Sequence, residues 1–260
     1  MSTLSQTVML AGQSVARLFG PPAHSRRFDA RRRLARHWLW TMMLGGISII
    51  ALMALVDAPE IRLMPPRGTA SLWPFRIMTD FGKSAYVLAA LGLGTLLVFV
   101  SSAFMRDTAR TRMIDLSRRL AFLFLAVLIP VEAGEVLKGI IGRGRPFVGG
   151  AADAFHYSHF TWNEAYASFP SGHAITAFAL AFALASLAPK WRIAIWAYAL
   201  IIAMTRLVLL AHHPSDVLAG ALVGILGAMA VRYWFAARHL IFTIAPDGAI
   251  RVARGGSADG

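Results

Sequence analysis

Six stretches of the chain are long, apolar and almost free of charged residues. They cover residues 38–56, 86–104, 120–137, 174–188, 193–210 and 217–235. About 20 apolar residues in a helix cross a hydrocarbon core of roughly 30 Å, so each stretch suits one crossing, although polar residues at the ends of the last three weaken their signal. The pattern predicts an all-α, polytopic membrane protein with six transmembrane helices in a bundle.

Shorter patterns lie outside the apolar stretches. Residues 70–86 mix aromatic and basic side chains, which is typical of a segment lying along the membrane surface. Residues 240–252 carry two β-prone runs around a Pro-Asp-Gly turn, which favours a short hairpin, and residues 253–260 favour a disordered tail. We therefore divide the chain into a basic arm (1–37), a transmembrane domain (38–237) and a tail that contains the hairpin (238–260).

Basic residues are distributed unevenly around the apolar stretches. Eighteen of the 26 Lys and Arg residues lie in the N-terminal arm, in residues 106–119, in the segment after the fourth stretch, and at the end of the sixth stretch or beyond it. Because positive charge favours the cytoplasmic side, both termini are expected in the cytoplasm and the loops 57–83, 138–172 and 211–216 on the outer face. The arm could equally contact anionic headgroups, and the further apolar stretches argue against a cleaved signal peptide.

Composition excludes several classes of protein. The chain is 57% hydrophobic and 15% charged, unlike an average soluble domain. The formal net charge of +13 could suggest a nucleic-acid partner, but the arginines flank apolar runs, so no nucleic acid is expected and membrane lipids are the expected surroundings. The absence of cysteine excludes disulfides and thiolate metal sites.

Three polar clusters fall at the expected outer ends of the last four stretches, within Lys138–Pro146, Pro170–His173 and Thr205–Asp216. Ionisable groups in such places are expensive and are treated as functional candidates. The cationic candidates suit phosphate oxygens, and a helix start at Ser171 and Gly172 would offer backbone N–H groups to an anion. Those cations are Lys138, Arg143, Arg145 and Arg206. Together the clusters predict a site for a compact, multiply charged anion, with phosphate the leading candidate.

Histidine and aspartate side chains add a possible reaction. A carboxylate that fixes one nitrogen of a histidine ring leaves the other free to attack phosphorus, and a second histidine can protonate the leaving oxygen. Structural alternatives exist for each group: Asp216 as a helix cap, Lys138 and Arg145 as interfacial side chains, and Glu135 as an ion-pair partner of Lys138 rather than a proton relay. His156 and His159 are interpreted as loop residues, and no metal site is expected.

The three clusters resemble the signature of the type 2 phosphatidic acid phosphatase superfamily, in its membrane lipid phosphatase branch. Lys138 and Arg145-Pro146 match K-x6-R-P, residues 170–173 match P-S-G-H, and residues 205–216 match S-R-x5-H-x3-D with Thr205 in place of serine. The spacing selects His212 over His213, which is expected beside the site, together with Thr205 and Arg143 as accessory groups.

The resemblance implies roles for the matching residues. His212 would be the nucleophile, Asp216 its orienting carboxylate and His173 the general acid. The phosphate would be held by Lys138, Arg145, Ser171, Gly172 and Arg206. Members of this family need no metal or other cofactor, act on lipid phosphates, and in bacteria commonly face the periplasm from the inner membrane.

The implied activity is hydrolysis of a lipid phosphomonoester or diphosphate through a phosphohistidine. Candidate substrates are phosphatidic acid, phosphatidylglycerol phosphate, a polyprenyl diphosphate and lipid A-type phosphates. A lipid phosphotransferase of the same fold, a vanadium-dependent haloperoxidase and a non-enzymatic transporter or scaffold are the alternatives. The apolar stretches argue against the soluble haloperoxidases, and the retained His173, His212 and Asp216 argue against an inactive relative. The oligomeric state is left open.

Overall fold

A computed structural model describes residues 3–22, 24–146, 148–150 and 152–253. Its α-helices are α1 (Thr3–Phe19), α2 (Arg27–Leu55), α3 (Asp57–Leu63), α4 (Trp73–Asp80), α5 (Ser84–Ser102), α6 (Asp107–Ile141), α7 (Gly172–Leu187), α8 (Arg192–Val208) and α9 (Pro214–Ala237). Three short 3-10 helices, η1 (Ala70–Leu72), η2 (Glu164–Tyr166) and η3 (Pro189–Trp191), and two strands, β1 (Phe242–Ile244) and β2 (Ile250–Val252), complete the elements.

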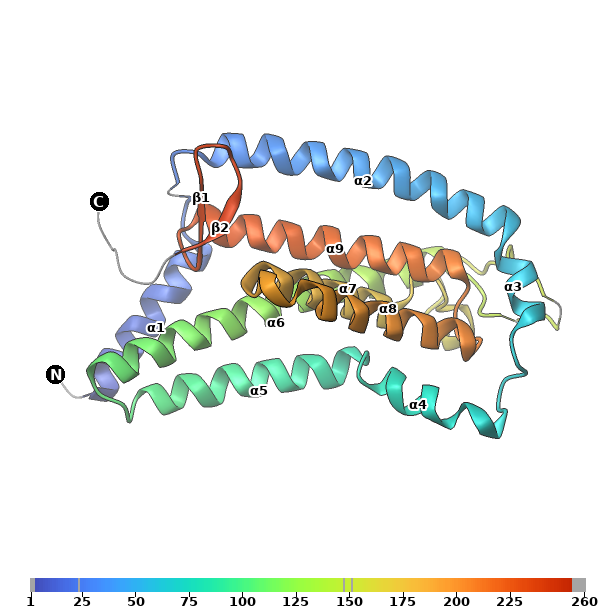
Figure 1. Ribbon diagram of the computed structural model, residues 1–260, viewed down its shortest axis with the longest axis horizontal. Coiled ribbons are helices and arrows are strands. Elements are labelled where there is room, and N and C mark those ends of the chain that lie inside the picture. Colours follow the sequence, from blue (N-terminus) through green and yellow to red (C-terminus); the bar gives the residue numbers. More distant parts are fainter. Residues whose placement is uncertain (1–2, 23, 147, 151, 254–260) are drawn as a thin grey trace.

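The long helices run side by side along the longest axis of the molecule (Figure 1). Helix α9 lies centrally and packs against α2, α6 and α7. Helices α3 and α4 lie at one end of the bundle, and α1 and the β-hairpin lie at the other. We call the end with α3 and α4 the site end and the opposite one the basic end.

Each of the six predicted stretches coincides with a helix, namely α2 and α5 to α9. Within the described residues, five helical segments are long and apolar enough to cross a membrane. Helix α7, with 16 residues, is shorter, so the count of six crossings stays a prediction. The all-α, polytopic character of the chain is confirmed.

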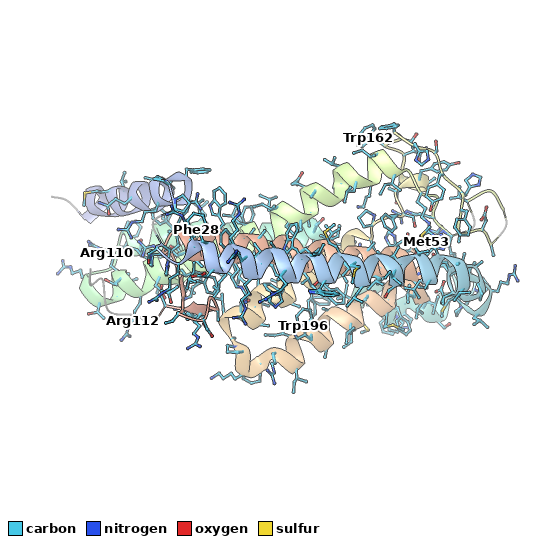
Figure 2. The ribbon with its side chains drawn as sticks, turned by 90° about the horizontal axis from the view of Figure 1, so that it is seen from above. Phe28, Met53, Arg110, Arg112, Trp162 and Trp196 are labelled. Atoms are coloured by element: carbon cyan, nitrogen blue, oxygen red, sulfur yellow. The ribbon has the colours of Figure 1, made fainter. Side chains whose placement is uncertain are left out.

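The surface of the bundle carries many large apolar side chains, as a lipid environment requires. In the segment Ala70–Ser102, which contains α5, no residue of the most apolar window is buried inside the protein. In α9, 56% of the corresponding window is buried. Side chains radiate from the helices along the whole length of the bundle (Figure 2), with Phe28, Arg110 and Arg112 at the basic end and Met53 and Trp162 at the site end.

Helices α7 and α9 approach each other closely because their facing residues are small. Helix α7 contributes Ala174 and Ala179, which have no exposed surface and lie beside Gly220 and Gly224 of α9. In α9, a Cβ at Gly220 would overlap the carbonyl oxygen of Ser171, and one at Gly224 would overlap that of Ile175. This small-residue seam places the start of α7 directly beside the start of α9.

The shorter predicted elements have mixed outcomes. The hairpin is confirmed: β1 pairs antiparallel with β2, and Gly248 takes φ +74° in the turn. Residues 70–80 form η1 and α4, while their location at a membrane surface stays a prediction. The N-terminal arm is largely helical, because it contains α1 and the first turns of α2. Of the predicted disordered tail (253–260), residues 254–260 lie outside the described residues.

Candidate active site

The sequence-predicted clusters meet at the site end of the bundle. Helices α6 and α8 end there, and α7 and α9 begin there, so the three clusters come from neighbouring helix termini (Figure 1). The backbone N–H of Ser171 donates to the carbonyl oxygen of Asp216 at 3.0 Å, which ties the second cluster to the third. Helix α6 ends at Gly142, whose φ of +58° favours glycine.

His212 lies in the short loop between α8 and α9 and is 3% exposed. Its Nδ1 is 2.8 Å from the carbonyl oxygen of Ser168. A carbonyl can only accept, so Nδ1 carries the ring proton and the lone pair of the neutral ring is on Nε2. Burial first, and then the positive charges of Arg206 and Arg145, hold the pKa of His212 well below its usual value. The ring is therefore neutral at pH 7, as a nitrogen nucleophile must be.

Asp216 is fully buried and contacts His212 less directly than the sequence suggested. Its Oδ2 lies 4.0 Å from Nδ1 of His212, because that oxygen accepts instead from the Ser168 hydroxyl at 2.6 Å and the backbone N–H of His213 at 2.8 Å. The bond to His213 caps α9, so the helix-cap interpretation is confirmed. Ser168 is the residue that links Asp216 to His212.

Lys138, Gly172 and Ser171 lie together at the start of α7. A Cβ on Gly172 would lie 2.9 Å from Nζ of Lys138, so the missing side chain leaves room beside the ammonium group. Lys138 also forms the expected ion pair with Glu135, at 2.5 Å. Ser171 occupies the N-cap position of α7, but its hydroxyl makes no capping hydrogen bond and has no partner among the described residues. That buried hydroxyl is available to a ligand.

Arg206 and Arg145, the two arginines that the signature assigns to phosphate, differ in their hydrogen bonds. Arg206 is 8% exposed and donates from Nη1 to the Thr79 hydroxyl of α4 at 2.7 Å, while its Nε–H has no partner within the described chain. Arg145 donates from Nε to the carbonyl oxygen of Glu164 at 2.9 Å. The hydroxyl of Thr205 donates to the carbonyl oxygen of Ile202 at 2.6 Å, and an accessory role for Thr205 stays a prediction.

His173 occupies the first turn of α7, beside the junction of α4 and α5. A Cβ on Gly82 would lie 3.3 Å from Cδ2 of His173, so a glycine permits this close approach. The ring Nε2 of His173 is buried and has no hydrogen-bond partner in the described part of the chain. A buried nitrogen without a partner is the arrangement expected of a group that exchanges a proton with bound substrate.

Arg143 and His213, the accessory candidates, both have no exposed surface. The guanidinium of Arg143 points into the protein and bonds to Asp57, Asp216, Ser215 and the carbonyl oxygen of Ala154. The burial of His213 places its ring away from any headgroup at the surface. Both residues donate hydrogen bonds to Asp216, so they support the site through this carboxylate.

Sequence reasoning missed four residues that hold the site in place: Asp57, Thr79, Ser168 and Ser215. A usable signal existed for Asp57, because it follows an apolar stretch directly and a charge there is costly to bury. Thr79 and Ser168 gave no such signal, since their roles depend on contacts between distant segments.

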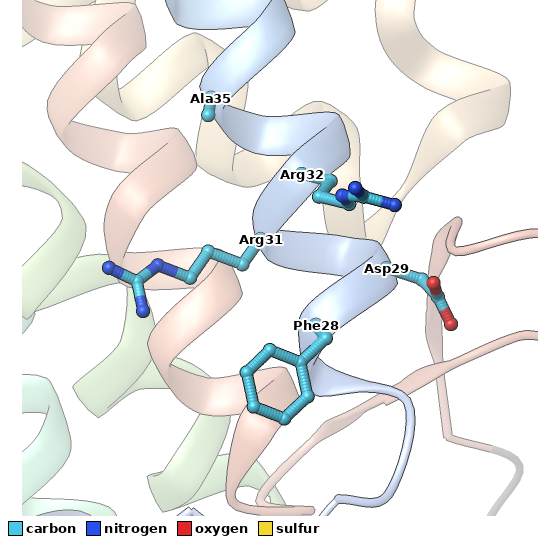
Figure 3. A pocket seen from close by; sticks show the side chains of 5 residues that line it. All are labelled: Phe28, Asp29, Arg31, Arg32 and Ala35. Atoms are coloured by element: carbon cyan, nitrogen blue, oxygen red, sulfur yellow. The ribbon is translucent and has the colours of Figure 1, made fainter.

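A separate pocket of about 500 Å³ lies at the start of α2 (Figure 3). It is lined by Phe28, Asp29, Arg31, Arg32 and Ala35. Because α2 begins at the basic end, this pocket is remote from the three clusters (Figure 2) and takes no part in the candidate active site.

Known proteins resemble this chain in sequence and in fold. Residues 118–240 match the PAP2 superfamily. A lipid A 1-phosphatase of Rhizobium johnstonii is 35% identical over 215 residues, which cover 81% of this chain and 86% of that protein. A lipid A 1-phosphatase of Rhizobium etli is 35% identical over 207 residues, covering 78% and 87%.

One solved structure has a similar fold. It is the crystal structure of the first transmembrane PAP2 type phosphatidylglycerolphosphate phosphatase from Bacillus subtilis, with a TM-score of 0.50, 21% identity, and coverage of 74% of this chain and 94% of that one. The sequence relatives, this shared fold and the apolar helices agree with one another. The chain belongs to the PAP2 superfamily and is a membrane lipid phosphatase.

Proposed function

We propose that this protein removes the 1-phosphate from a lipid A-type glycolipid. Both sequence relatives are lipid A 1-phosphatases, and each aligns with more than three quarters of this chain. The Bacillus phosphatase supports the fold alone, so its substrate gives no reason to prefer phosphatidylglycerol phosphate. We further propose that the site end faces the periplasm from the bacterial inner membrane, in agreement with the distribution of basic residues.

The tautomer of His212 is the observation that carries the mechanism. Its Nδ1–H donates to Ser168, so Nε2 presents a lone pair. In the first step Nε2 attacks phosphorus, a nitrogen–phosphorus bond forms and the bond from phosphorus to the lipid oxygen breaks. His173 gives a proton to that leaving oxygen.

The second step releases phosphate. A water molecule attacks the phosphohistidine, His173 takes a proton from this water, and the nitrogen–phosphorus bond breaks. Inorganic phosphate leaves, and His212 and His173 return to their starting protonation states. The same two residues act in opposite directions in the two steps, as microscopic reversibility requires.

The other residues that match the signature would stabilise the transferring phosphoryl group. Lys138 and Arg145 bring positive charge from the end of α6 and the loop after it, and Arg206 brings it from the end of α8. Ser171 offers its unpartnered hydroxyl, and the start of α7 offers the backbone N–H groups that begin with Gly172. Preorganised donors of this kind stabilise the charge that develops in the transition state.

The test is phosphate release by the purified, detergent-solubilised protein in the presence of a chelator. Four substrates are compared: lipid A, phosphatidic acid, phosphatidylglycerol phosphate and a polyprenyl diphosphate. The expected result is the fastest release from lipid A, inhibition by vanadate, and no release by His212→Ala. Preference for another lipid would overturn the substrate. Dependence on a divalent ion or full activity of His212→Ala would overturn the mechanism, and a phosphorylated acceptor in place of free phosphate would identify a phosphotransferase.

A further inference from the structure

Asp57 is a carboxylate that neither the family signature nor the proposed mechanism uses. It is the first residue of α3, and its side chain has no exposed surface. Oδ2 accepts from Nη2 of Arg143 at 2.7 Å and from the Ser215 hydroxyl at 2.5 Å, and Oδ1 accepts from the Ser215 backbone N–H at 3.1 Å. Asp57 thus connects the segment after α2 with α9.

Arg143 is the first link between Asp57 and the site. A guanidinium has five N–H donors, and Arg143 makes five hydrogen bonds within the protein. It therefore has no donor left for a phosphate. Its Nη1 donates to Oδ1 of Asp216 at 2.6 Å while its Nη2 donates to Asp57, so the guanidinium is held between the two carboxylates.

Ser215 is the second link. Its hydroxyl accepts from Arg143 at 2.6 Å and donates to Asp57. Since Ser215 precedes Asp216 in the first turn of α9, Asp57 fixes Asp216 through the guanidinium and through the backbone. From Asp216 the contacts continue through the Ser168 hydroxyl to the Ser168 carbonyl oxygen, which holds His212.

The network also carries surplus negative charge. Two buried carboxylates face one guanidinium, and charges without exposed surface are poorly screened. Burial first, and then Asp57 and Asp216, raise the pKa of the neighbouring Glu60 to about 7, as expected beside an excess of negative charge. The excess negative charge stabilises the positive charge that His212 acquires on attack, whereas Arg206 and Arg145 destabilise that positive charge.

We infer that Asp57 is a positioning residue for phosphoryl transfer, which acts on His212 through Arg143, Ser215 and Asp216. The inference rests on the proposed phosphohistidine mechanism. Replacing Asp57 with asparagine keeps the shape of the side chain and removes one negative charge. The phosphate-binding candidates at the start of α7 and the end of α8 are not among the hydrogen-bond partners of Asp57 in the described chain, so substrate binding is expected to survive the change.

The experiment measures phosphohistidine formation by rapid-quench kinetics in a single turnover, with ³²P-labelled lipid. In Asp57→Asn the rate constant is expected to fall by about 10-fold to 100-fold, the cost of displacing or weakening groups behind a reacting centre. The labelled amplitude per mole of total protein and the vanadate affinity are expected to stay at the wild-type level. The control is Asp115→Asn, which removes a half-exposed carboxylate paired with Arg119 in α6 and should change neither quantity.

A structural defect alone would lower the amplitude and leave the rate constant unchanged, and this result would overturn the inference. If Asp57→Asn does not fold, Ser215→Ala removes one link by itself: a severalfold lower rate constant supports the inference and an unchanged one overturns it. Failure of the wild-type protein to form any phosphohistidine would instead overturn the proposed mechanism.

Discussion

His212 and His213 are neighbours in the chain, yet their hydrogen bonds and surroundings indicate different roles. The ring of His212 is oriented by the Ser168 carbonyl oxygen and lies near Arg206 and Arg145. His213 has no exposed surface, and its backbone N–H serves the cap of α9. Spacing alone selected His212, and the hydrogen bonds supply the physical reason.

Substitution of the two histidines separates these roles. His212→Ala is expected to lower kcat by at least about 10³-fold, because it removes the nucleophile itself. His213→Ala removes a packed ring and is expected to lower the melting temperature while keeping most of the activity per folded molecule. Phosphate release and a thermal melt of each variant check this. Equal losses of activity in the two variants would contradict it.

Glu60 creates a pH dependence of stability. It is 7% exposed, both of its carboxylate oxygens lack a partner among the described residues, and its pKa is raised from 4.5 to about 7. The folded protein therefore holds this proton more tightly than the unfolded chain does. The stability that the neutral carboxyl contributes is present below about pH 4.5 and is lost as the pH rises toward 7.

Glu60→Gln removes this titration, since the amide stays neutral. The variant is expected to melt at a higher temperature than the wild type at pH 8, with the difference shrinking toward pH 4.5. Melting curves from the fluorescence of the seven tryptophans at several pH values measure it. A difference that stays constant with pH would show that folding does not raise the pKa of Glu60.

At the scale of the elements, the seam between α7 and α9 sets the geometry of the site. Gly220 and Gly224 let the two backbones meet, and the N–H of Ser171 then reaches the carbonyl oxygen of Asp216. Ser171 and Asp216, 45 positions apart in the chain, come together because the small side chains of the seam let the two helices approach, and the hydrogen bond between them then forms.

Two matched glycine substitutions test the seam. Gly224→Ala places a methyl group against the backbone of α7, 2.9 Å from the N of Ala179, and is expected to cost about 1–3 kcal/mol. Gly46→Ala, on α2, meets nothing within 4 Å and is expected to change stability by less than about 0.5 kcal/mol. Thermal melts in detergent compare them. Equal tolerance of both changes would contradict the close packing.

The sequence predicted the elements better than the contacts between them. Apolar length located the helices, and the turn residues located the hairpin. The spacing of the signature located His212, Lys138 and Arg206. The hydrogen-bond partners of the site residues could not be predicted from the sequence. Thr79 bonds to Arg206 across 127 positions, and Asp57 bonds to Ser215 across 158. Such pairs depend on how the helices pack against one another, and a single sequence does not show this packing.

At the scale of the whole molecule, charge and chemistry lie at opposite ends. The basic end holds α1, the start of α2 and the arginines that precede and begin α6 (Figure 2), and the site end holds the candidate active site (Figure 1). Under the positive-inside rule this separation supports the proposed orientation, in which the site end lies on the outer side of the membrane.

The chain contains no cysteine, so single cysteines can report this orientation without further changes. Arg112→Cys and Trp162→Cys place one thiol at each end (Figure 2). A membrane-impermeant maleimide is expected to label Trp162→Cys in intact spheroplasts and Arg112→Cys only after permeabilisation. The reverse pattern would place the site end in the cytoplasm.

The backbone contact between α7 and α9 also bears on how such an enzyme can diversify. Two helices that touch through glycine have no side chains there to exchange, so nearly every substitution at the seam would disturb the site itself. The exposed side chains of α3, of α4 and of the described residues between 142 and 167 lie outside the seam and are free of that restriction. New headgroup preferences can therefore arise in these segments while the seam stays unchanged, which would allow one reaction centre to serve many lipids.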